Sequence, residues 1–217
     1  MQRKRVLIVD DHAIVRKGLA LLINQEKDLF VCGEAEDADV VPGLIDEQKP
    51  HVVILDISLK GTGGLEILAR LRAQHRGLPV LILSMHDSLI YVERALKAGA
   101  NGYLMKHEGA ENLILAIHSV LRGETYLSEA LQKKLLGTYL GHGQDKTASS
   151  VERLSPREFE ILQLLGRGHS TRRIADRLHL SIKTIESHRE NIKEKLNLKN
   201  ATELIQYATR WSVLESN

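Results

Sequence analysis

The sequence predicts an open parallel α/β sheet followed by a smaller all-α domain, and three observations support this. Short β-branched runs alternate with helical patterns five times through about residue 123. The strand runs are continuously apolar, which is typical of strands covered by helices on both faces. From Ser155 onward only helical patterns remain. A chain of 217 residues is long enough for two such domains, each with its own core.

The five expected strands lie near residues 5–9, 29–35, 51–55, 80–84 and 101–105. Apolar residues recur at helical spacing between them, as Val15 and Leu19 do after the first strand and Leu113 and Ile117 after the last. Five strand–helix units of this length fit a flavodoxin-like α/β domain, whose parallel five-stranded sheet has the order 2-1-3-4-5.

The segment after the last predicted strand–helix unit has first a helical pattern and then no apolar pattern. Residues 128–140 have the spacing of one more helix, whereas residues 141–150 have no apolar period and are typical of a flexible linker. The predicted organisation is therefore a first domain at residues 1–127, a helix and linker at 128–150, and a second domain at 151–217.

The second domain is expected to contain four helices. Ser155 and Glu158 form a capping box around Pro156, which predicts a helix start. Ser170 and Ser181 are expected to cap the next two helices, and the fourth covers residues 201–211. The tight turn at residues 179–182 makes the middle pair a helix-turn-helix, whose later helix normally enters the major groove of DNA.

Composition excludes several classes of protein. Charged residues make up 27% and hydrophobic residues 43%, as in a folded globular protein. Lys and Arg number 15 against 17 Asp and Glu in residues 1–127, but 12 against 9 in residues 150–217, so only the second part is expected to meet a polyanion. Cys32 is the only cysteine, which excludes an intramolecular disulfide and Cys/His zinc patterns.

The basic start of the chain precedes an apolar run of only Val6 to Val9, which is too short for a signal peptide or a membrane span. We therefore expect a cytoplasmic protein without a membrane partner.

Groups suited to phosphoryl chemistry follow four of the predicted strands. They are Asp10 and Asp11, Asp56, Ser84, and Lys106. Ligands bind outside the carboxyl ends of parallel strands, so these side chains should converge, although each alone is more often a cap or an ordinary strand end. Three close carboxylates call for a cation, and Mg²⁺ suits oxygen ligands. We expect Asp56 to be the nucleophile and Ser84 and Lys106 to bind the transferred group.

These residues, with Ala98 to Tyr103 before the lysine, resemble the receiver domain of two-component response regulators over residues 4–124. The resemblance implies that Asp56 accepts phosphate from a sensor histidine kinase. It also implies that Asp11, Asp56 and the Ser58 carbonyl bind Mg²⁺, with Asp10 acting through the metal site or its waters. Ser84 would be the switch hydroxyl and Tyr103 the switch aromatic residue.

The chain departs from this pattern at Leu59 and Lys60, where the family often has Met-Pro. Lys60 either tunes phosphate lifetime or metal affinity, or points to solvent, and we favour the second interpretation.

The second domain resembles the LuxR-type DNA-binding domain over residues 150–214, on its Leu154–Glu158, Ser181–His188 and Asn191–Leu196 motifs. A receiver followed by this domain is the NarL/FixJ architecture. It implies a homodimer when phosphorylated, double-stranded DNA with paired half-sites as a partner, and contact with RNA polymerase. No stretch resembles an acyl-homoserine-lactone domain.

Three glutamates lie on the expected DNA face of the third helix, opposite Ile185 and Ile192. Glu186 or Glu190 either accepts a hydrogen bond from cytosine or pairs with basic neighbours and stays off the DNA, and Glu194 is expected to pair. Ser187 is a further candidate for base contact. The expected phosphate contacts are Lys183, Thr184, His188 and Lys193, with Arg172 or Arg173 in addition.

Two other functions fit parts of the sequence. An enzyme of the flavodoxin-like or phosphoaspartate-hydrolase class is disfavoured, because the chain has no phosphate-binding glycine loop after the first strand and no Asp-x-Asp nucleophile pair among its phosphoryl-site residues. A receiver used only for protein interaction is disfavoured by the complete set of site residues. The leading interpretation is a transcription factor whose only chemistry is self-phosphorylation from small phosphodonors and slow aspartyl-phosphate hydrolysis.

Overall fold

The computed structural model describes residues 3–59, 64–85, 89–140, 151, 153–178 and 180–215. The chain divides into two compact units, residues 1–141 and 142–217. The expected linker at 141–150, Lys60 and the turn residue His179 lie outside the described residues. None of the helices within the described ranges has both the length and the apolar character needed to cross a membrane.

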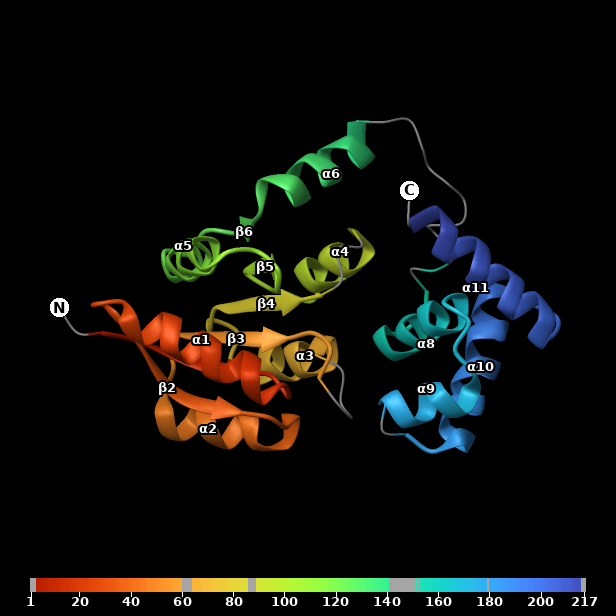
Figure 1. The fold of residues 1–217 in the computed structure, drawn as a ribbon, viewed down its shortest axis with the longest axis horizontal. Coiled ribbons are helices and arrows are strands. Elements are labelled where there is room, and N and C mark those ends of the chain that lie inside the picture. Colours follow the sequence, from red (N-terminus) through yellow and green to blue (C-terminus); the bar gives the residue numbers. More distant parts are fainter. Residues whose placement is uncertain are drawn as a thin grey trace. The chain divides into compact units, whose positions relative to one another are not determined.

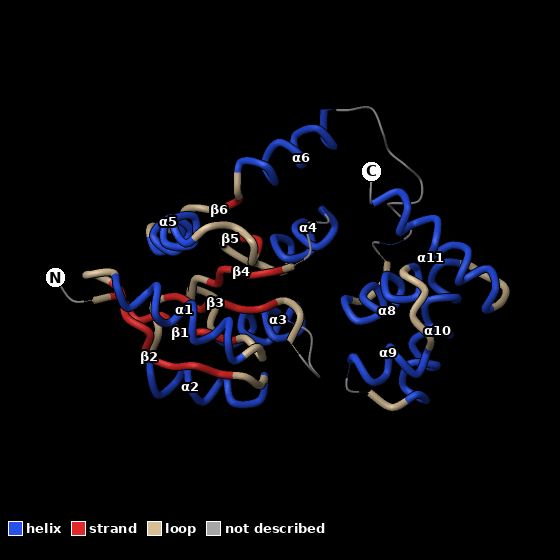
Figure 2. Tube along the Cα trace, in the orientation of Figure 1, coloured by secondary structure: helices blue, strands red, loops and turns tan. Residues whose placement is uncertain are grey.

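The first unit alternates strands and helices, as the sequence predicts (Figures 1 and 2). Its strands are β1 (Lys4–Val9), β2 (Leu29–Ala35), β3 (Val52–Asp56), β4 (Val80–Ser84), β5 (Gly102–Met105) and β6 (Tyr126–Leu127). Its helices are α1 (Ala13–Gln25), the short 3₁₀ helix η1 (Ala38–Val40), α2 (Val41–Gln48), α3 (Gly64–Gln74), α4 (Leu89–Lys97), α5 (Ala110–Leu121) and α6 (Glu129–Leu140).

The strands form one parallel sheet with the order β2-β1-β3-β4-β5-β6. The predicted order 2-1-3-4-5 is confirmed, but the prediction of five strands is wrong, because β6 adds a sixth. Tyr126 and Leu127 pair with Gly102 and Tyr103 of β5. A strand of two residues has no apolar run of its own, so periodicity does not reveal it. The predicted helix at 128–140 is confirmed as α6.

Helices cover the sheet and bury its strands. Side chains of α1 and α5 pack on one face, where Ile23 and Ile117 meet Val6, Ile54 and Leu104. Alternate residues such as Leu7 and Leu55 point to the other face, and both are fully buried. This two-sided burial is the physical reason for the continuous apolar runs in the sequence.

The sheet brings the ends of four strands to one edge. The strand order reverses at β1, which pairs with β2 on one side and with β3 on the other. Asp10 follows β1, Asp56 and Ser84 end β3 and β4, and Lys106 follows β5. The polar residues predicted to form a site therefore all lie at the carboxyl edge, beside the switch point.

The second unit contains α8 (Pro156–Gly166), α9 (Thr171–Leu178), α10 (Ile182–Leu196) and α11 (Ala201–Glu215). The predicted capping box at Ser155 and Glu158 is confirmed. The core of the second unit is closed by α8 and α11. The Phe159 and Trp211 rings of these helices meet edge to face, with their centroids 6.2 Å apart. Gly166 lets these two helices approach closely, since a Cβ there would lie 2.4 Å from the Ala208 carbonyl oxygen.

Candidate functional site

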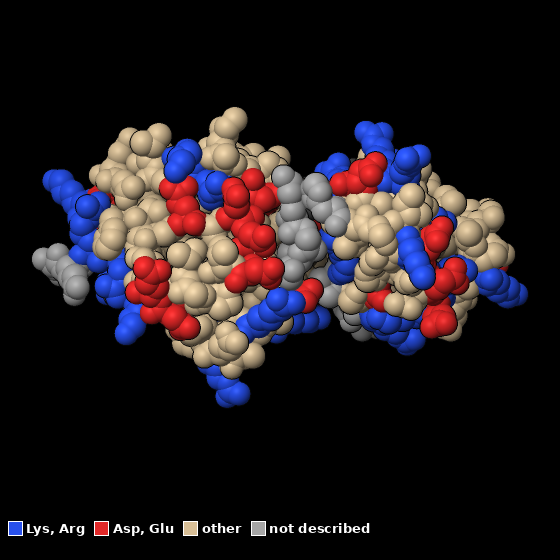
Figure 3. All heavy atoms as spheres, turned by 90° about the horizontal axis from the view of Figure 1, so that it is seen from below, with Lys and Arg blue, Asp and Glu red and all other residues tan. Residues whose placement is uncertain are grey.

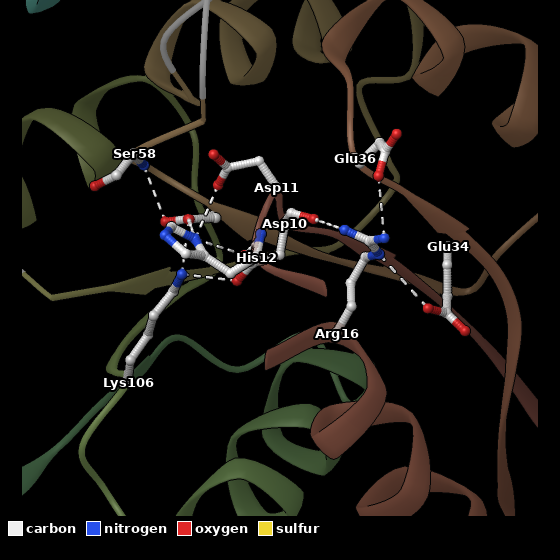
Figure 4. A network of polar contacts seen from close by, with 9 residues as sticks. Asp10, Asp11, His12, Arg16, Glu34, Glu36, Ser58 and Lys106 are labelled. Carbon is white, nitrogen blue, oxygen red and sulfur yellow. Dashed lines mark hydrogen bonds and ion pairs between the residues drawn. The ribbon is translucent and has the colours of Figure 1, made fainter. Parts of the chain in front are cut away.

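The sheet edge holds an acidic pocket into which Lys106 reaches (Figure 4). The Lys106 Nζ atom lies 2.7 Å from Oδ2 of both Asp10 and Asp56. Both aspartates are 1% exposed, and the Asp11 side chain is 4% exposed. A charge-neutralising contact is required at such depth, because a buried unpaired carboxylate is strongly destabilising.

Backbone groups fix the positions of the reactive side chains. The Ser58 N–H donates to Asp56 Oδ1 over 2.9 Å, so both oxygens of Asp56 have partners. The Lys106 N–H donates to the Ser84 carbonyl over 2.7 Å, which holds the ends of β4 and β5 together. Ser84 is fully buried. The structure therefore brings together the predicted residues Asp10, Asp11, Asp56, Ser84 and Lys106.

The electrostatics of Asp56 and Lys106 are coupled. Burial raises the pKa of the Asp56 carboxyl, and the Lys106 ammonium and the Ser58 N–H oppose that rise. Burial also disfavours the Lys106 ammonium, but Asp56 and Asp10 outweigh it and raise the pKa of Lys106. Lys106 therefore remains protonated and supports the ionised form of Asp56 that a nucleophile requires.

The pocket has the donor set of a divalent-cation site. Ligand atoms of Asp10, Asp11, His12 and Asp56 lie within 4.8 Å of one another. Carboxylate oxygens are the ligands that Mg²⁺ prefers, so these residues fit the expected cofactor. His12 was not among the residues predicted from the sequence, although its position directly after the two aspartates was an available signal.

The predicted switch residue Tyr103 lies on β5, which β4 separates from the strand of Asp56. Its ring is fully buried in this structure. Tyr103 pairs with Ile82 of β4 and with Leu127 of β6. The ring is thus in an inward position, in a strand that contacts both the pocket lysine and the final strand of the sheet.

Arg16 is a second residue near the pocket that the sequence analysis missed. Its Nη1 donates to the Asp10 carbonyl over 2.7 Å, and its Nη2 donates to Glu36 over 3.2 Å (Figure 4). The Arg16 side chain is 12% exposed, and its Nε lies 3.6 Å from Glu34. The guanidinium therefore ties the end of β1 to β2 and to α1.

The predicted DNA face of α10 is open to solvent, and its opposite face is buried. Ile185 and Ile192 are fully buried. The exposed residues of the helix include Lys183, Glu186, Ser187, Glu190, Asn191 and Glu194. Several of them line a groove beside the start of α11.

The glutamates of this face differ in their partners. Glu190 pairs with Lys193 over 2.8 Å, as the alternative of neighbouring basic partners predicts. The side chain of Lys193, which is a predicted contact to DNA phosphate, is 18% exposed. Among the residues that the structure describes, none forms an ion pair with Glu186. Thr184 lies at the helix start, where the Ser181 hydroxyl accepts from its N–H.

His188 lies toward the interior of the helical unit. Its Nδ1 is buried and has no hydrogen-bond partner among the described residues. Burial lowers the pKa of His188, Glu158 opposes this, and Arg157 and Lys195 add to it. The neutral form is therefore favoured, which makes His188 a weaker candidate for a phosphate contact than Lys183.

Charge is distributed differently over the two units. On the face seen in Figure 3, acidic side chains gather on the first unit, whereas basic and acidic side chains are interleaved on the second. The acidic side chains on the first unit agree with the excess of Asp and Glu over Lys and Arg in residues 1–127.

Comparison with known proteins identifies both units. Residues 6–118 match the response regulator receiver domain, and residues 152–208 match the luxR family of bacterial regulatory proteins. The fold and the pocket thus define a receiver joined to a DNA-binding domain.

The whole chain also has relatives of the same length. It is 38% identical over 216 residues to the oxygen regulatory protein NreC of Staphylococcus epidermidis, which covers 97% of this chain and 99% of NreC. The chain belongs to the NarL/FixJ family of two-component response regulators, and it is a transcriptional regulator.

Solved structures support this assignment. RcsB of Salmonella enterica serovar Typhimurium, bound to the promoter P1flhDC in the presence of the phosphomimetic BeF₃⁻, matches with a TM-score of 0.65 at 27% identity, over 96% of this chain and 100% of that chain. The response regulator ChrA of a heme-sensing system matches with a TM-score of 0.53 at 33% identity, over 97% and 98% of the two chains.

Proposed function

We propose that a sensor histidine kinase phosphorylates Asp56 and that this modification controls dimerisation and sequence-specific DNA binding. The observation that carries the proposal is the pocket itself, in which Lys106 lies 2.7 Å from Asp56 and Asp10 at the carboxyl ends of β5, β3 and β1. The proposal also includes self-phosphorylation from small phosphodonors and slow hydrolysis of the aspartyl phosphate.

The transfer needs only a nucleophile and charge stabilisation. An oxygen of the Asp56 carboxylate bonds to phosphorus while the bond from phosphorus to the donor breaks, and the donor's leaving atom keeps the electron pair. Lys106 and the Ser84 hydroxyl bind oxygens of the transferred group. Mg²⁺, held by Asp10, Asp11, Asp56 and the Ser58 carbonyl, would neutralise charge on those oxygens when bound.

The phosphoryl group then shifts a two-state equilibrium. The Ser84 hydroxyl moves toward the phosphoryl group and leaves space that the Tyr103 ring can occupy. This movement favours the inward position that the ring has in this structure. The face formed by β4, α4, β5 and α5 changes with it. That change promotes dimers, frees α10 for DNA, or does both.

DNA binding follows from the family and from the exposed face of α10. RcsB is described as bound to promoter DNA, and by analogy this chain would bind paired half-sites as a dimer. Lys183, Thr184, Lys193 and His188 are proposed phosphate contacts, with Glu186, Ser187 and Glu190 near base edges. The protein would act in the cytoplasm, where it would meet RNA polymerase.

The test is labelling with acetyl phosphate and Mg²⁺, followed by intact mass. We expect the wild type to gain one phosphoryl group, and Asp56→Asn to gain none while its circular dichroism is unchanged. Asp28→Asn, which changes an exposed aspartate outside the pocket, should label normally. Labelling of Asp56→Asn at the wild-type rate would show that the site assignment is wrong.

A further inference from the structure

His12 places an imidazole over the acidic pocket. Its Nδ1 lies 2.9 Å from Asp11 Oδ1, 3.2 Å from Asp10 Oδ1 and 3.9 Å from Asp56 Oδ2. The ring therefore faces all three carboxylates, and Figure 4 shows it beside Asp10 and Asp11. In the part of the chain that the structure describes, it is the only histidine grouped with them as a possible metal ligand.

The backbone holds this arrangement in place. The His12 N–H donates to Asp10 Oδ1 over 2.8 Å, so the side chain of one pocket residue fixes the backbone of the next. His12 is also the residue before α1, with an extended backbone at φ −88° and ψ 102°. The Cα of His12 is thus fixed relative to Asp10, while its side chain remains 57% exposed.

We propose that His12 supplies a nitrogen ligand to the cation of this pocket, so that the site selects a borderline divalent cation such as Co²⁺ over Mg²⁺. This inference rests on the proposed function, because it concerns the cation of the same pocket. It deepens that function by naming the class of metal that His12 favours.

The chemistry of the ligand set supports the selection. Three carboxylates without an imidazole form a hard oxygen site, which suits Mg²⁺. Imidazole nitrogen suits softer first-row cations, and affinity for a mixed nitrogen and oxygen site rises from Mn²⁺ to Co²⁺. Because Mg²⁺ keeps several water ligands, it gains little from the His12 nitrogen.

His12 has a simpler alternative role, which is to donate a hydrogen bond to Asp11 or Asp10. Two substitutions separate the roles. Asparagine places an amide that can donate near the position of Nδ1 but offers no imidazole nitrogen, and alanine removes both. A donor role predicts that His12→Asn behaves like the wild type, whereas a ligand role predicts that it behaves like His12→Ala in its affinity for Co²⁺.

The experiment titrates the full chain with Mg²⁺ and with Co²⁺ by calorimetry, and it follows the visible absorption of bound Co²⁺. His107→Ala is the matched control, because His107 is exposed, follows Lys106 directly and is not part of the cluster. We expect both His12 variants to lose at least about tenfold in Co²⁺ affinity, the range already caused by loss of an outer-shell partner. Their Co²⁺ absorption should change, while Mg²⁺ affinity and the control stay at wild-type values.

Unchanged Co²⁺ affinity and absorption in His12→Asn would overturn the ligand role, and so would an equal loss for Mg²⁺ and Co²⁺. Failure of the proposed function would look different, since the wild type would then bind neither cation in the pocket and Asp56 would not be labelled.

Discussion

At the residue scale, Arg16 connects the pocket to the rest of the first unit. The guanidinium donates to the Asp10 carbonyl, and it contacts Glu34 of β2 and Glu36 just after that strand. It touches no reacting atom, so it is a positioning residue. Losing it leaves Asp10 in the pocket but removes the group that fixes the end of β1.

We predict that Arg16→Ala weakens Mg²⁺ binding by about tenfold, the lower end of the range for an outer-shell partner. Calorimetry of the metal measures this directly. Lys17→Ala is the control, because Lys17 also pairs with Glu34, at 3.0 Å, but does not contact Asp10. Equal Mg²⁺ affinity in Arg16→Ala and Lys17→Ala would argue against a positioning role.

The glutamates of α10 are expected to act in different ways. Glu190→Ala removes the partner of Lys193 and frees a cation for DNA phosphate, so the salt slope of DNA binding should steepen by about one.

Glu186→Ala should instead change the preferred sequence, with a loss of about 1–3 kcal/mol at one base pair if Glu186 reads cytosine. Binding-site selection at several salt concentrations measures both effects. The same consensus for the wild type and Glu186→Ala would show that Glu186 only balances charge.

The pocket could be predicted from the sequence because its residues end a strand or come directly after one, and parallel strands place their ends together. His12 and Arg16 could not be predicted in the same way. Their roles depend on how the first turn of α1 lies against the ends of β1 and β2. Likewise, the spacing of α10 allows an ion pair at Glu190, but only the side-chain geometry shows that it forms.

At the element scale, the start of α3 packs directly against the strand that carries Asp56. The Gly64 N–H donates to the Ile57 carbonyl over 3.0 Å. A Cβ on Gly64 would lie 2.4 Å from the Asp56 carbonyl oxygen and 2.5 Å from the Ile57 Cα. Backbone atoms cannot move aside as a flexible side chain does, so glycine is required here for close approach.

We predict that Gly64→Ala destabilises the first unit by about 1–3 kcal/mol, the usual cost of overpacking. The control is Gly18→Ala in α1, where a Cβ would have no heavy atom within 4 Å. That variant should gain up to about 1 kcal/mol, because alanine has the higher helix propensity. Thermal unfolding by circular dichroism compares the two. Equal melting temperatures would contradict the close approach of α3 to β3.

At the scale of the whole molecule, the proposed control of DNA binding through dimers needs a surface by which two copies associate. Within α11, Leu204, Ala208 and Trp211 are buried against the helical unit's own core. Ile205 is 46% exposed on the same helix. An apolar side chain in this position is available to pack against a second copy.

We predict that BeF₃⁻ raises the dimer fraction and the affinity for a selected promoter fragment, and that Ile205→Glu reduces both gains. Burying a charge at an interface is costly, whereas the exposed site tolerates it in the monomer. Gln206→Glu is the control, because it adds the same charge at an exposed neighbour. Sedimentation and DNA titration measure the effect, and fluorescence of Trp211, the only tryptophan, checks the fold. Equal dimer fractions with and without BeF₃⁻ would refute the coupling.

The short length of the two-residue strand β6 limits strand pairing between the sheet edges of two copies of this protein. An edge strand with unpaired backbone groups is a template for strands of other chains, and proteins protect such edges by keeping them very short. β6 pairs with the first two residues of β5 through only Tyr126 and Leu127, and α6 begins two residues later. This edge therefore resists uncontrolled aggregation through strand pairing. Any contact between copies on that side must be made by side chains, and a chemical signal can regulate such contacts.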